Sequence, residues 1–425
     1  MAMAKRSSPP SQKERAEGKG VGLVLAGGAS RGAYEVGVVR YVLEEISAAL
    51  GRNVPLDVLC GTSAGSINAA MLAALADRPV ERGQMLAARW TGLKLDELVR
   101  PAPGEMLALM GRLVGRSPPP AKQRVRRGGL FDPTGIENIV TDAIPFENIE
   151  RHMRAGLVAA LSISTTHIAT GRTVVFVQRR EGHMPRWGSD PTMVGRTAEI
   201  RAEHVLASAA VPLLFPAVDI DGQFYCDGGL RQNVPLSPAR RLGADSLIVV
   251  SPRYIHEDEP TAAEAEERET EYPDPLFVLG KAMNALLLDR IENDIERLRR
   301  LNAIMEAGRR RWGPEFAQGL NEELKKMGIG GLRHLDVVYV RASQDIGKMA
   351  AEYVQSPLFA KRVKGLLGRA LRRIAEGAEE ADLLSYVMFD GEFCGRLIEM
   401  GRSDAALRRE ELVTLFAKRL EQAKT

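Results

Sequence analysis

The sequence predicts an α/β fold, in which helices cover both faces of a mostly parallel sheet in a three-layer α/β/α arrangement. Short apolar runs alternate with helical patterns through the first half of the 425-residue chain, which is typical of parallel strands joined by helices. Three glycine-rich turns also directly follow apolar, strand-like runs. The second half is mostly helical by pattern, so we expect a helical C-terminal region packed on the α/β core.

Hydrophobic spacing places the individual elements. Short apolar runs predict strands near residues 21–26, 56–60, 156–164, 173–178, 223–226, 246–251 and 335–341. Helical spacing predicts helices near residues 32–49, 64–76, 84–98, 105–114, 133–143, 202–209, 275–308, 358–380 and 405–422. We divide the chain into a tail at 1–19 with the composition of disorder, an α/β core at 20–252, and a mainly helical region at 253–425 with one added strand. The acidic stretch Glu257–Glu271 is the best candidate for a mobile loop between the halves.

The first glycine-rich turn, Gly27–Gly32, opens a helical pattern after the apolar run Val21–Ala26. Consecutive glycines let backbone N–H groups point into one small space beside a helix N-terminus, which suits a phosphate or an oxyanion. Nucleotide binding is the less favoured interpretation. The loop lacks the Gly-Lys-Ser/Thr ending of a phosphate-binding loop, and Ala29 stands where a dinucleotide fingerprint has its second glycine.

The second turn, Gly61-Thr62-Ser63-Ala64-Gly65, has the pattern G-x-S-x-G between an apolar run and a helical run of small residues. A serine at such a turn is strained and exposed, with its hydroxyl at the helix N-terminus. We expect the flanking glycines to leave room for a substrate carbonyl. Ser63 is therefore a candidate nucleophile for acyl transfer, and a tight turn with an ordinary serine is the alternative.

The third turn, Asp227-Gly228-Gly229, presents a carboxylate with little steric cover after the strand-like run Gln223–Cys226. A serine nucleophile needs a base, and in most serine hydrolases histidine serves. None of the six histidines has a recognisable catalytic setting. If Asp227 is the acid of an α/β-hydrolase triad, only His256 and His334 follow it as candidates; surface or loop histidines explain both better.

In this order, the three turns resemble the signatures of the patatin-like phospholipases, and the similarity to bacterial members extends over most of residues 20–405. Further similar segments are Leu161–Phe176, Ala207–Pro216, Asn284–Asn302 and Ser385–Ala405. Ala29 departs from the family, where many members have a third glycine. The motif-supporting residues are Arg31, Gly32, Gly61, Ala64, Gly65, Gly228 and Gly229.

The resemblance implies a Ser63–Asp227 dyad, in which Asp227 takes the Ser63 proton and returns it to the leaving alcohol, with an acyl-enzyme intermediate. The backbone amides of Gly27, Gly28 and Ala29 would form the oxyanion hole, with Ala64 as a further candidate donor. Arg31 either contacts a substrate phosphate or pins the loop through a salt bridge, and the sequence leaves both open.

The resemblance also implies hydrolysis of lipid acyl esters by a phospholipase A or lysophospholipase that needs no metal or cofactor. The alternatives are a neutral-lipid or general carboxylesterase, and a lipid-binding regulatory protein with little turnover. Three cysteines indicate a reducing compartment. No apolar run approaches the roughly 20 residues that span a bilayer, and the N-terminus lacks the apolar segment of a signal peptide.

We therefore expect a cytoplasmic protein with a lipid ester substrate, peripheral contact with a membrane surface and no nucleic-acid partner. The basic clusters Arg124–Arg127 and Arg309–Arg311 are candidate contacts with anionic lipid, and solvated charge is the alternative. The helical face Met106–Leu113 is either a lid or interfacial anchor, or part of the core.

Overall fold

The computed structural model describes residues 20–100, 102, 129–180, 184, 187, 192–231, 234–255, 278, 280–284, 291–327, 332–375 and 382–422. Four expectations fall outside these residues: the tail at 1–19, the helical face Met106–Leu113, the cluster Arg124–Arg127 and the loop Glu257–Glu271. His256 also lies outside them.

A mixed nine-stranded sheet runs through the described residues in the order β5-β4-β3-β2-β1-β8-β9, with β7 pairing to β3 and β6 to β7. Five of the eight strand pairings are parallel, and the antiparallel ones are β3/β4, β3/β7 and β6/β7. The mostly parallel sheet is thus confirmed. The strands are β1 (Gly20–Leu25), β2 (Val58–Thr62), β3 (Ala160–His167), β4 (Thr173–Arg179), β5 (Met193–Thr197), β6 (Val218–Ile220), β7 (Gln223–Asp227), β8 (Ala244–Ser251) and β9 (Asp336–Arg341).

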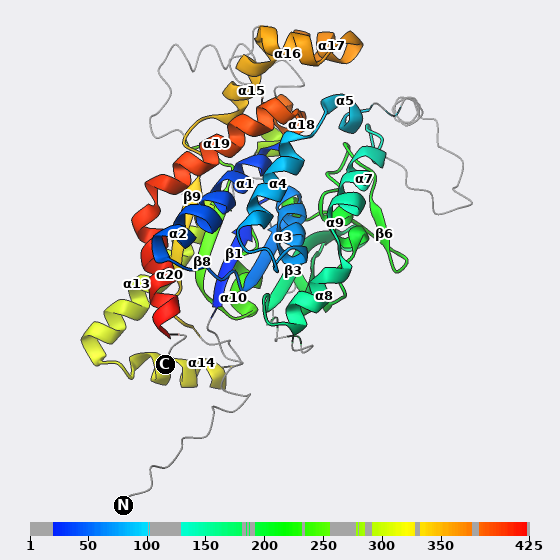
Figure 1. Ribbon diagram of the computed structural model, residues 1–425. Helices are drawn as coiled ribbons and strands as arrows, with labels where there is room; N and C mark the ends of the chain where they lie inside the picture. The colour runs from blue at the N-terminus through cyan, green and yellow to red at the C-terminus, as the bar shows by residue number, and fades with distance from the viewer. Residues whose placement is uncertain are drawn as a thin grey trace, which may run out of the picture.

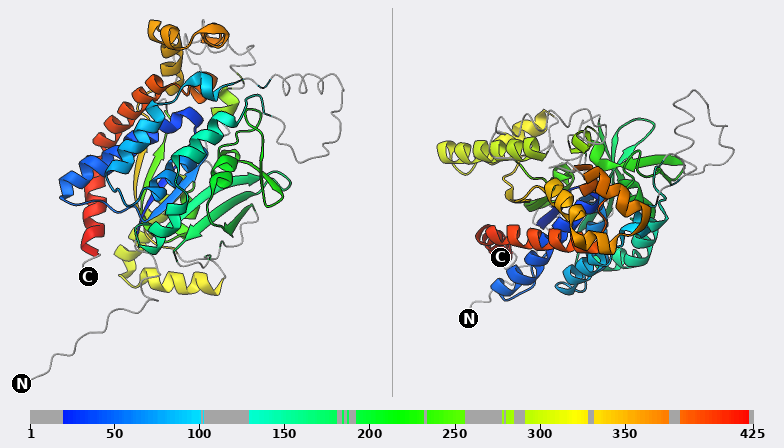
Figure 2. Two further views of the ribbon diagram at one scale, coloured as in Figure 1. Left: turned by 45° about the vertical axis from the view of Figure 1, so that its right-hand side comes forward. Right: turned by 90° about the horizontal axis from the view of Figure 1, so that it is seen from above.

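Helices cover both faces of this sheet. Val21, Leu23 and Leu25 of β1 face the layer that contains α1, α3, α4, α8, α9 and α19, whereas Val24 faces the layer that contains α10 and α13. Seen from above, α13 and α14 lie on one side of the molecule, and α1 and α19 lie on the other (Figure 2). The three-layer arrangement and the helical C-terminal region are confirmed.

The helices of the first half are α1 (Gly32–Tyr41), which continues through η2 (Val42–Ile46) into α2 (Ser47–Leu50), then α3 (Ala64–Ala74), α4 (Glu81–Thr91), α5 (Leu95–Leu98), α7 (Thr134–Ala143), α8 (Glu147–Arg154), α9 (Ala202–Ser208) and α10 (Leu236–Arg241). Two short 3-10 turns are η1 (Ala29–Arg31) and η3 (Gly228–Leu230). The helix expected over 84–98 is interrupted between α4 and α5, where Gly92 and Leu93 leave the helical ladder.

The helices of the second half are α13 (Ile291–Trp312), α14 (Phe316–Lys326), α15 (Ile346–Gln355), α16 (Pro357–Arg362), α17 (Gly365–Ala375), α18 (Asp382–Val387), α19 (Gly391–Leu407) and α20 (Arg409–Gln422). Within this region, the expected helix over 358–380 is broken between α16 and α17. The helix expected over 405–422 corresponds to α20 and starts four residues too early, because Ala405–Leu407 end α19 and Arg408 separates the two helices. Arg309–Arg311 lie in the last turn of α13 and are exposed. Arg310 pairs with Glu306 at 3.5 Å. No described helix combines the length and the apolar character that crossing a bilayer requires.

The C-terminal helices pack directly on the first helix of the core. α19 runs alongside α1 (Figure 1), and glycines allow the close approach. A Cβ at Gly37 would lie 1.9 Å from the carbonyl oxygen of Ile398, and one at Gly401 would lie 2.1 Å from that of Tyr34. The Tyr34 hydroxyl also donates to Asp404 at 2.9 Å. The helix that follows the first glycine-rich turn is thereby joined to the C-terminal region.

Candidate active site

Ser63 lies at a sharp turn between β2 and α3. Its φ of 53° and ψ of −127° are strained for a residue with a side chain. A Cβ at Gly61 would lie 2.2 Å from the carbonyl oxygen of Gly65, and one at Gly65 would lie 2.5 Å from that of Leu25. Both glycines are thus required by contacts between backbone segments. Ser63 is also only 3% exposed, so the expectation of an exposed serine is wrong.

Ser208, a residue that the sequence analysis did not single out, holds the backbone of this turn. The N–H of Ser63 donates to Ser208 Oγ at 2.9 Å, and the Ser208 hydroxyl donates to the carbonyl of Ser164 at 2.7 Å. Ser208 is fully buried at the end of α9. Its sequence signal is weak: it is one serine within the run Ala207–Pro216.

Asp227 ends β7 and is brought toward Ser63 by the pairing of β7 with β3, which places it opposite Thr165. Its Oδ1 accepts a hydrogen bond from the Gly229 N–H at 2.7 Å. Its Oδ2 is buried and has no hydrogen-bond partner of regular geometry within the described residues. A Cβ at Gly228 would lie 2.3 Å from the carbonyl oxygen of Ser164, so the turn also needs its glycine.

The environment of Asp227 makes its carboxyl an unusually good base. Complete burial raises its pKa to about 7, and hydrogen bonding from the Ser63 side chain and the Gly229 amide lowers the pKa by less. The Ser63 hydroxyl therefore lies close to the carboxyl, although no hydrogen bond of regular geometry joins it to Asp227 Oδ2. The structure brings together the two side chains that the sequence analysis paired.

The first glycine-rich turn follows β1, the neighbour of β2, and packs against the Ser63 turn. A Cβ at Gly32 would lie 2.6 Å from that of Ala64, so the two turns nearly touch. Ala29 has a φ of 49°, a left-handed conformation that costs a residue with a Cβ about 1–2 kcal/mol. A glycine would adopt this conformation without that cost, whereas Ala29 must be held in it by the surrounding structure.

Arg31 points away from solvent and pins this loop. It is 3% exposed and its guanidinium pairs with Asp382 at 3.1 Å. Its Nε donates to Ser385 Oγ at 2.8 Å, and it stacks 4.2 Å from the centre of the Tyr386 ring. Of the two roles left open by the sequence, these contacts favour the salt bridge over contact with a substrate phosphate.

An apolar pocket lies between α3, α4 and α7, and the Trp90 ring is one of its lining side chains. The Trp90 ring would contact a Cβ at Gly32 at 3.0 Å, and its Nε1 donates to Asn68 Oδ1 at 2.9 Å, which fixes the ring near the start of α3. The lining residues of the pocket are Ile67, Met71, Leu86, Arg89, Trp90, Leu93, Leu98, Ile136, Ile139, Ala143, Phe215 and Phe389.

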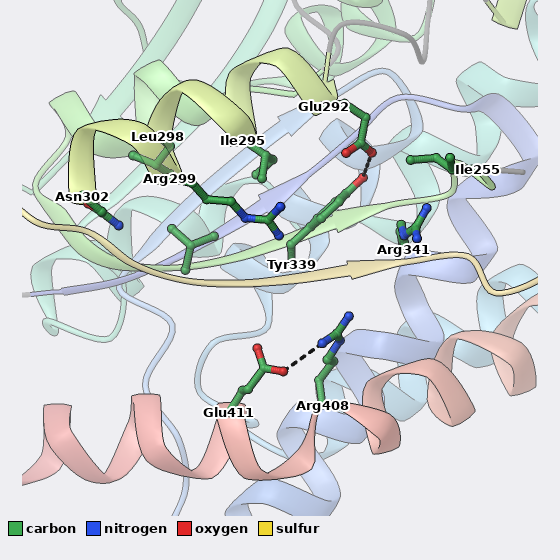
Figure 3. Close-up of a pocket in the computed structure, with 11 residues that line it drawn as sticks. Ile255, Glu292, Ile295, Leu298, Arg299, Asn302, Tyr339, Arg341, Arg408 and Glu411 are labelled. Atoms are coloured by element: carbon green, nitrogen blue, oxygen red, sulfur yellow. Dashed lines mark hydrogen bonds and ion pairs between the residues drawn. The ribbon is translucent and has the colours of Figure 1, made fainter. Parts of the chain in front are cut away.

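A second, polar pocket of about 340 Å³ lies at the β9 edge of the sheet, between α13, β9 and α20 (Figure 3). The Tyr339 hydroxyl donates to Glu292 at 2.8 Å, and Arg408 pairs with Glu411 at 3.0 Å. None of the candidate site residues lines it.

The described histidines have other partners. His152 is buried against the carbonyl of Ala73, His204 accepts from the N–H of Arg201 at the start of α9, and His334 lies 3.5 Å from Asp336. None of the described histidines hydrogen bonds to Ser63 or Asp227. Within the described part of the chain, no group of three or more His, Cys, Asp or Glu side chains is placed to hold a metal ion.

The chain is similar to several known proteins. The chain is 27% identical over 240 residues to a patatin-like phospholipase domain-containing protein of Caenorhabditis elegans, covering 56% of this chain and 14% of that protein. It is 26% identical over 245 residues to Lysophospholipase NTE1 of Phaeosphaeria nodorum, covering 58% of this chain and 13% of that protein. The solved structure of human GIVD cytosolic phospholipase A2 shares 12% identity at a TM-score of 0.36, covering 97% of this chain and 61% of that one.

The chain spans about a seventh of the length of these curated relatives. A sequence model described as Patatin-like phospholipase matches residues 23–240, which is just over half of the chain and includes all three glycine-rich turns. By this match, the chain belongs to the patatin-like phospholipase family.

Proposed function

We propose that the protein is a lipid acyl hydrolase, a phospholipase A or lysophospholipase, that works through Ser63 and Asp227. The observation that carries the proposal is the approach of the strained Ser63 to a fully buried carboxyl whose pKa burial raises to about 7. Efficient proton transfer needs a base whose pKa lies near the working pH. At its ordinary pKa of 3.8, a carboxylate is a poor base for a serine hydroxyl.

In the proposed reaction, Ser63 Oγ attacks the ester carbonyl carbon while its proton passes to Asp227. The carbonyl oxygen becomes an oxyanion that the amides of Gly27, Gly28 and Ala29 stabilise. Collapse of this intermediate breaks the bond to the alcohol, which takes the proton from Asp227. Water then attacks the acyl-serine, Asp227 accepts its proton, and return of that proton to Ser63 releases the fatty acid.

The apolar pocket supports a lipid substrate. Its lining is almost wholly apolar, and one lining residue, Trp90, packs against Gly32, which in turn contacts Ala64, the residue after the proposed nucleophile. Each methylene group of an acyl chain that leaves water contributes about 0.8 kcal/mol. We propose that this pocket receives the acyl chain of the ester.

The test is mass spectrometry of a mixed-lipid extract after incubation with the wild-type protein or with Ser63→Ala. We expect free fatty acids and lysophospholipids to appear with the wild type alone. Fatty acids released only from neutral lipids would favour the carboxylesterase alternative. Lipid binding without products from either protein would favour the regulatory alternative and contradict the proposal.

Filling the apolar pocket should shorten the preferred acyl chain. Ala143→Phe adds a ring at the half-buried end of α7, inside the pocket. We expect kcat/KM for a long-chain ester to fall about 10-fold, the effect of excluding two buried methylene groups, and kcat/KM for a butyrate ester to stay within about 2-fold of wild type.

The matched control is Ala317→Phe, which places the same ring at a half-buried helical alanine in α14, outside this pocket. It should leave the dependence on chain length unchanged. If kcat/KM of Ala143→Phe depends on acyl-chain length as it does in the wild type, the pocket does not receive the acyl chain.

Removing the hydroxyl of Ser208 should lower kcat because the Ser63 N–H would lose its acceptor. We expect Ser208→Ala to lower kcat about 10-fold, since a small displacement of reacting groups is costly. Ser47→Ala is a close control, because Ser47 is a buried serine whose Oγ accepts from the Val54 N–H at 3.2 Å. Both variants should lose thermal stability, and only Ser208→Ala should lose turnover. Equal kcat in the two variants would show that Ser208 is merely structural.

A further inference from the structure

We infer that Asp382 is a positioning residue for the proposed reaction. Through Arg31, Asp382 and the short helix α18 hold the glycine-rich loop so that its amides face the substrate carbonyl. The inference rests on the proposed function and adds a part of the site that lies far outside residues 23–240, the extent of the family match.

The loop needs an external support. Ala29 has a positive φ of 49°, and a residue with a side chain keeps such a conformation only where its surroundings impose it. The next two residues supply the anchoring contacts. The Ser30 hydroxyl donates to the carbonyl of Ser385, and the Arg31 side chain reaches Ser385 and Asp382. The support for the strained residue therefore comes from α18.

The ion pair between Arg31 and Asp382 is buried. The side chains of Arg31 and Asp382 are 4% and 9% exposed, and Lys281 pairs with the other Asp382 oxygen at 3.2 Å. Burial alone would raise the pKa of the Asp382 carboxyl, but the charges of Arg31 and Lys281 hold it below its ordinary value. Asp382 therefore stays ionised at neutral pH and gives the Arg31 guanidinium a fixed partner.

The geometry of the loop explains why this support matters for turnover. An oxyanion hole works only when its donors already point at the position that the oxyanion will occupy. In this chain, Gly28 and Ala29 immediately precede the two anchored residues. Release of Arg31 would let Ala29 relax toward negative φ, which would turn the neighbouring amides away. Loss of the anchor should thus lower the rate of the chemical step more than it weakens substrate binding.

The test measures kcat and KM for a soluble short-chain ester, together with melting temperature, for Asp382→Asn. We expect kcat to fall about 10- to 100-fold, as for a displaced or missing oxyanion donor, with KM within about 2-fold of wild type. The rate of labelling by a fluorophosphonate probe should fall in parallel, because the probe reacts through the same oxyanion hole.

The matched control is Asp404→Asn. Asp404 is a similarly buried C-terminal carboxylate, and it accepts from the Tyr34 hydroxyl of α1 and from the Ser343 N–H without touching the loop. It should lower the melting temperature and leave kcat unchanged. If the two variants lose kcat in proportion to their loss of stability, Asp382 has only a structural role and the inference fails.

A further variant separates positioning from the cost of an unpaired buried charge. The double variant Arg31→Met/Asp382→Asn removes both buried charges and leaves only Lys281, whose side chain is 41% exposed, so it should regain melting temperature while kcat stays low. Recovery of kcat would overturn the inference. Should Asp382→Asn not fold, the double variant gives the same test, and a wild-type kcat in it would overturn the inference.

Ser63→Ala, assayed in parallel, separates a failure of the proposed function from a failure of the role proposed for Asp382. Hydrolysis that persists in Ser63→Ala would contradict the proposed function itself. An inactive Ser63→Ala beside an Asp382→Asn variant of wild-type kcat would leave the proposed function intact and reject only the role of Asp382.

Discussion

Ser63→Ala is expected to abolish ester hydrolysis, lowering kcat by about 10⁴-fold or more, as removal of a serine nucleophile does in other hydrolases. Labelling by a fluorophosphonate probe should disappear as well, because the probe forms its bond with the activated hydroxyl. Alanine keeps the Cβ of serine, so the positive φ of 53° at this turn is no more strained than before. Circular dichroism and melting temperature should therefore remain near those of the wild type.

Ser47→Ala serves as the control for Ser63→Ala, since it removes a buried hydroxyl of the same core without touching either turn. It should keep both hydrolysis and labelling. Labelling that persists in Ser63→Ala at the wild-type rate would show that another nucleophile reacts and that the assignment of Ser63 is wrong.

Local sequence patterns were sufficient for much of the fold. Seven of the nine strands lie in short apolar runs, and the parallel arrangement follows from their alternation with helices. β5 was missed because Met193–Thr197 is a half-exposed edge strand with a glycine and an arginine. β6 was missed because it has only three residues. Such strands are fixed by their neighbours in the sheet, and their own sequence carries little periodicity.

The candidate site likewise contains residues that sequence patterns identify and residues that only the folded structure reveals. Ser63 and Asp227 were identified from the glycine-rich turns that carry them, because these residue types appear directly in the sequence, although the contacts that require Gly65 and Gly228 come from the distant residues Leu25 and Ser164. The burial that raises the pKa of Asp227 to about 7 depends on strands and helices distant in the chain. Ser208 acts on Ser63 across 145 residues, and Asp382 reaches Arg31 across 351 residues. Pattern analysis has no access to contacts of that range.

Asp227→Asn should lower kcat by about 100-fold or more, because it keeps the shape of the side chain and removes the general base. In the wild type, kcat/KM should rise with pH through about 7, since the carboxyl must lose its proton before it can accept one from Ser63. Asparagine does not titrate, so the residual activity of the variant should lack this rise. The measurement is a pH profile of kcat/KM with a soluble ester.

The same substitution should raise stability above pH 7. The folded-state pKa of Asp227 lies near 7 and its ordinary value is 3.8, so the folded protein holds this proton more tightly than the unfolded chain. The associated stability is fully present below about pH 4 and is lost as pH rises through about 7. The melting temperature of Asp227→Asn should therefore exceed that of the wild type by more at pH 8 than at pH 4. A constant difference would contradict the raised pKa.

The histidines decide between this dyad and a triad. His334→Ala and His256→Ala should each keep most of the activity, because His334 pairs with Asp336 and the dyad needs no imidazole. Asp404→Asn controls for the replacement of a buried aspartate and should also remain active. A histidine variant as inactive as Asp227→Asn would identify that histidine as the base. Asp227 would then be the group that orients the histidine, and the rise of kcat/KM near pH 7 would report the imidazole instead of the carboxyl.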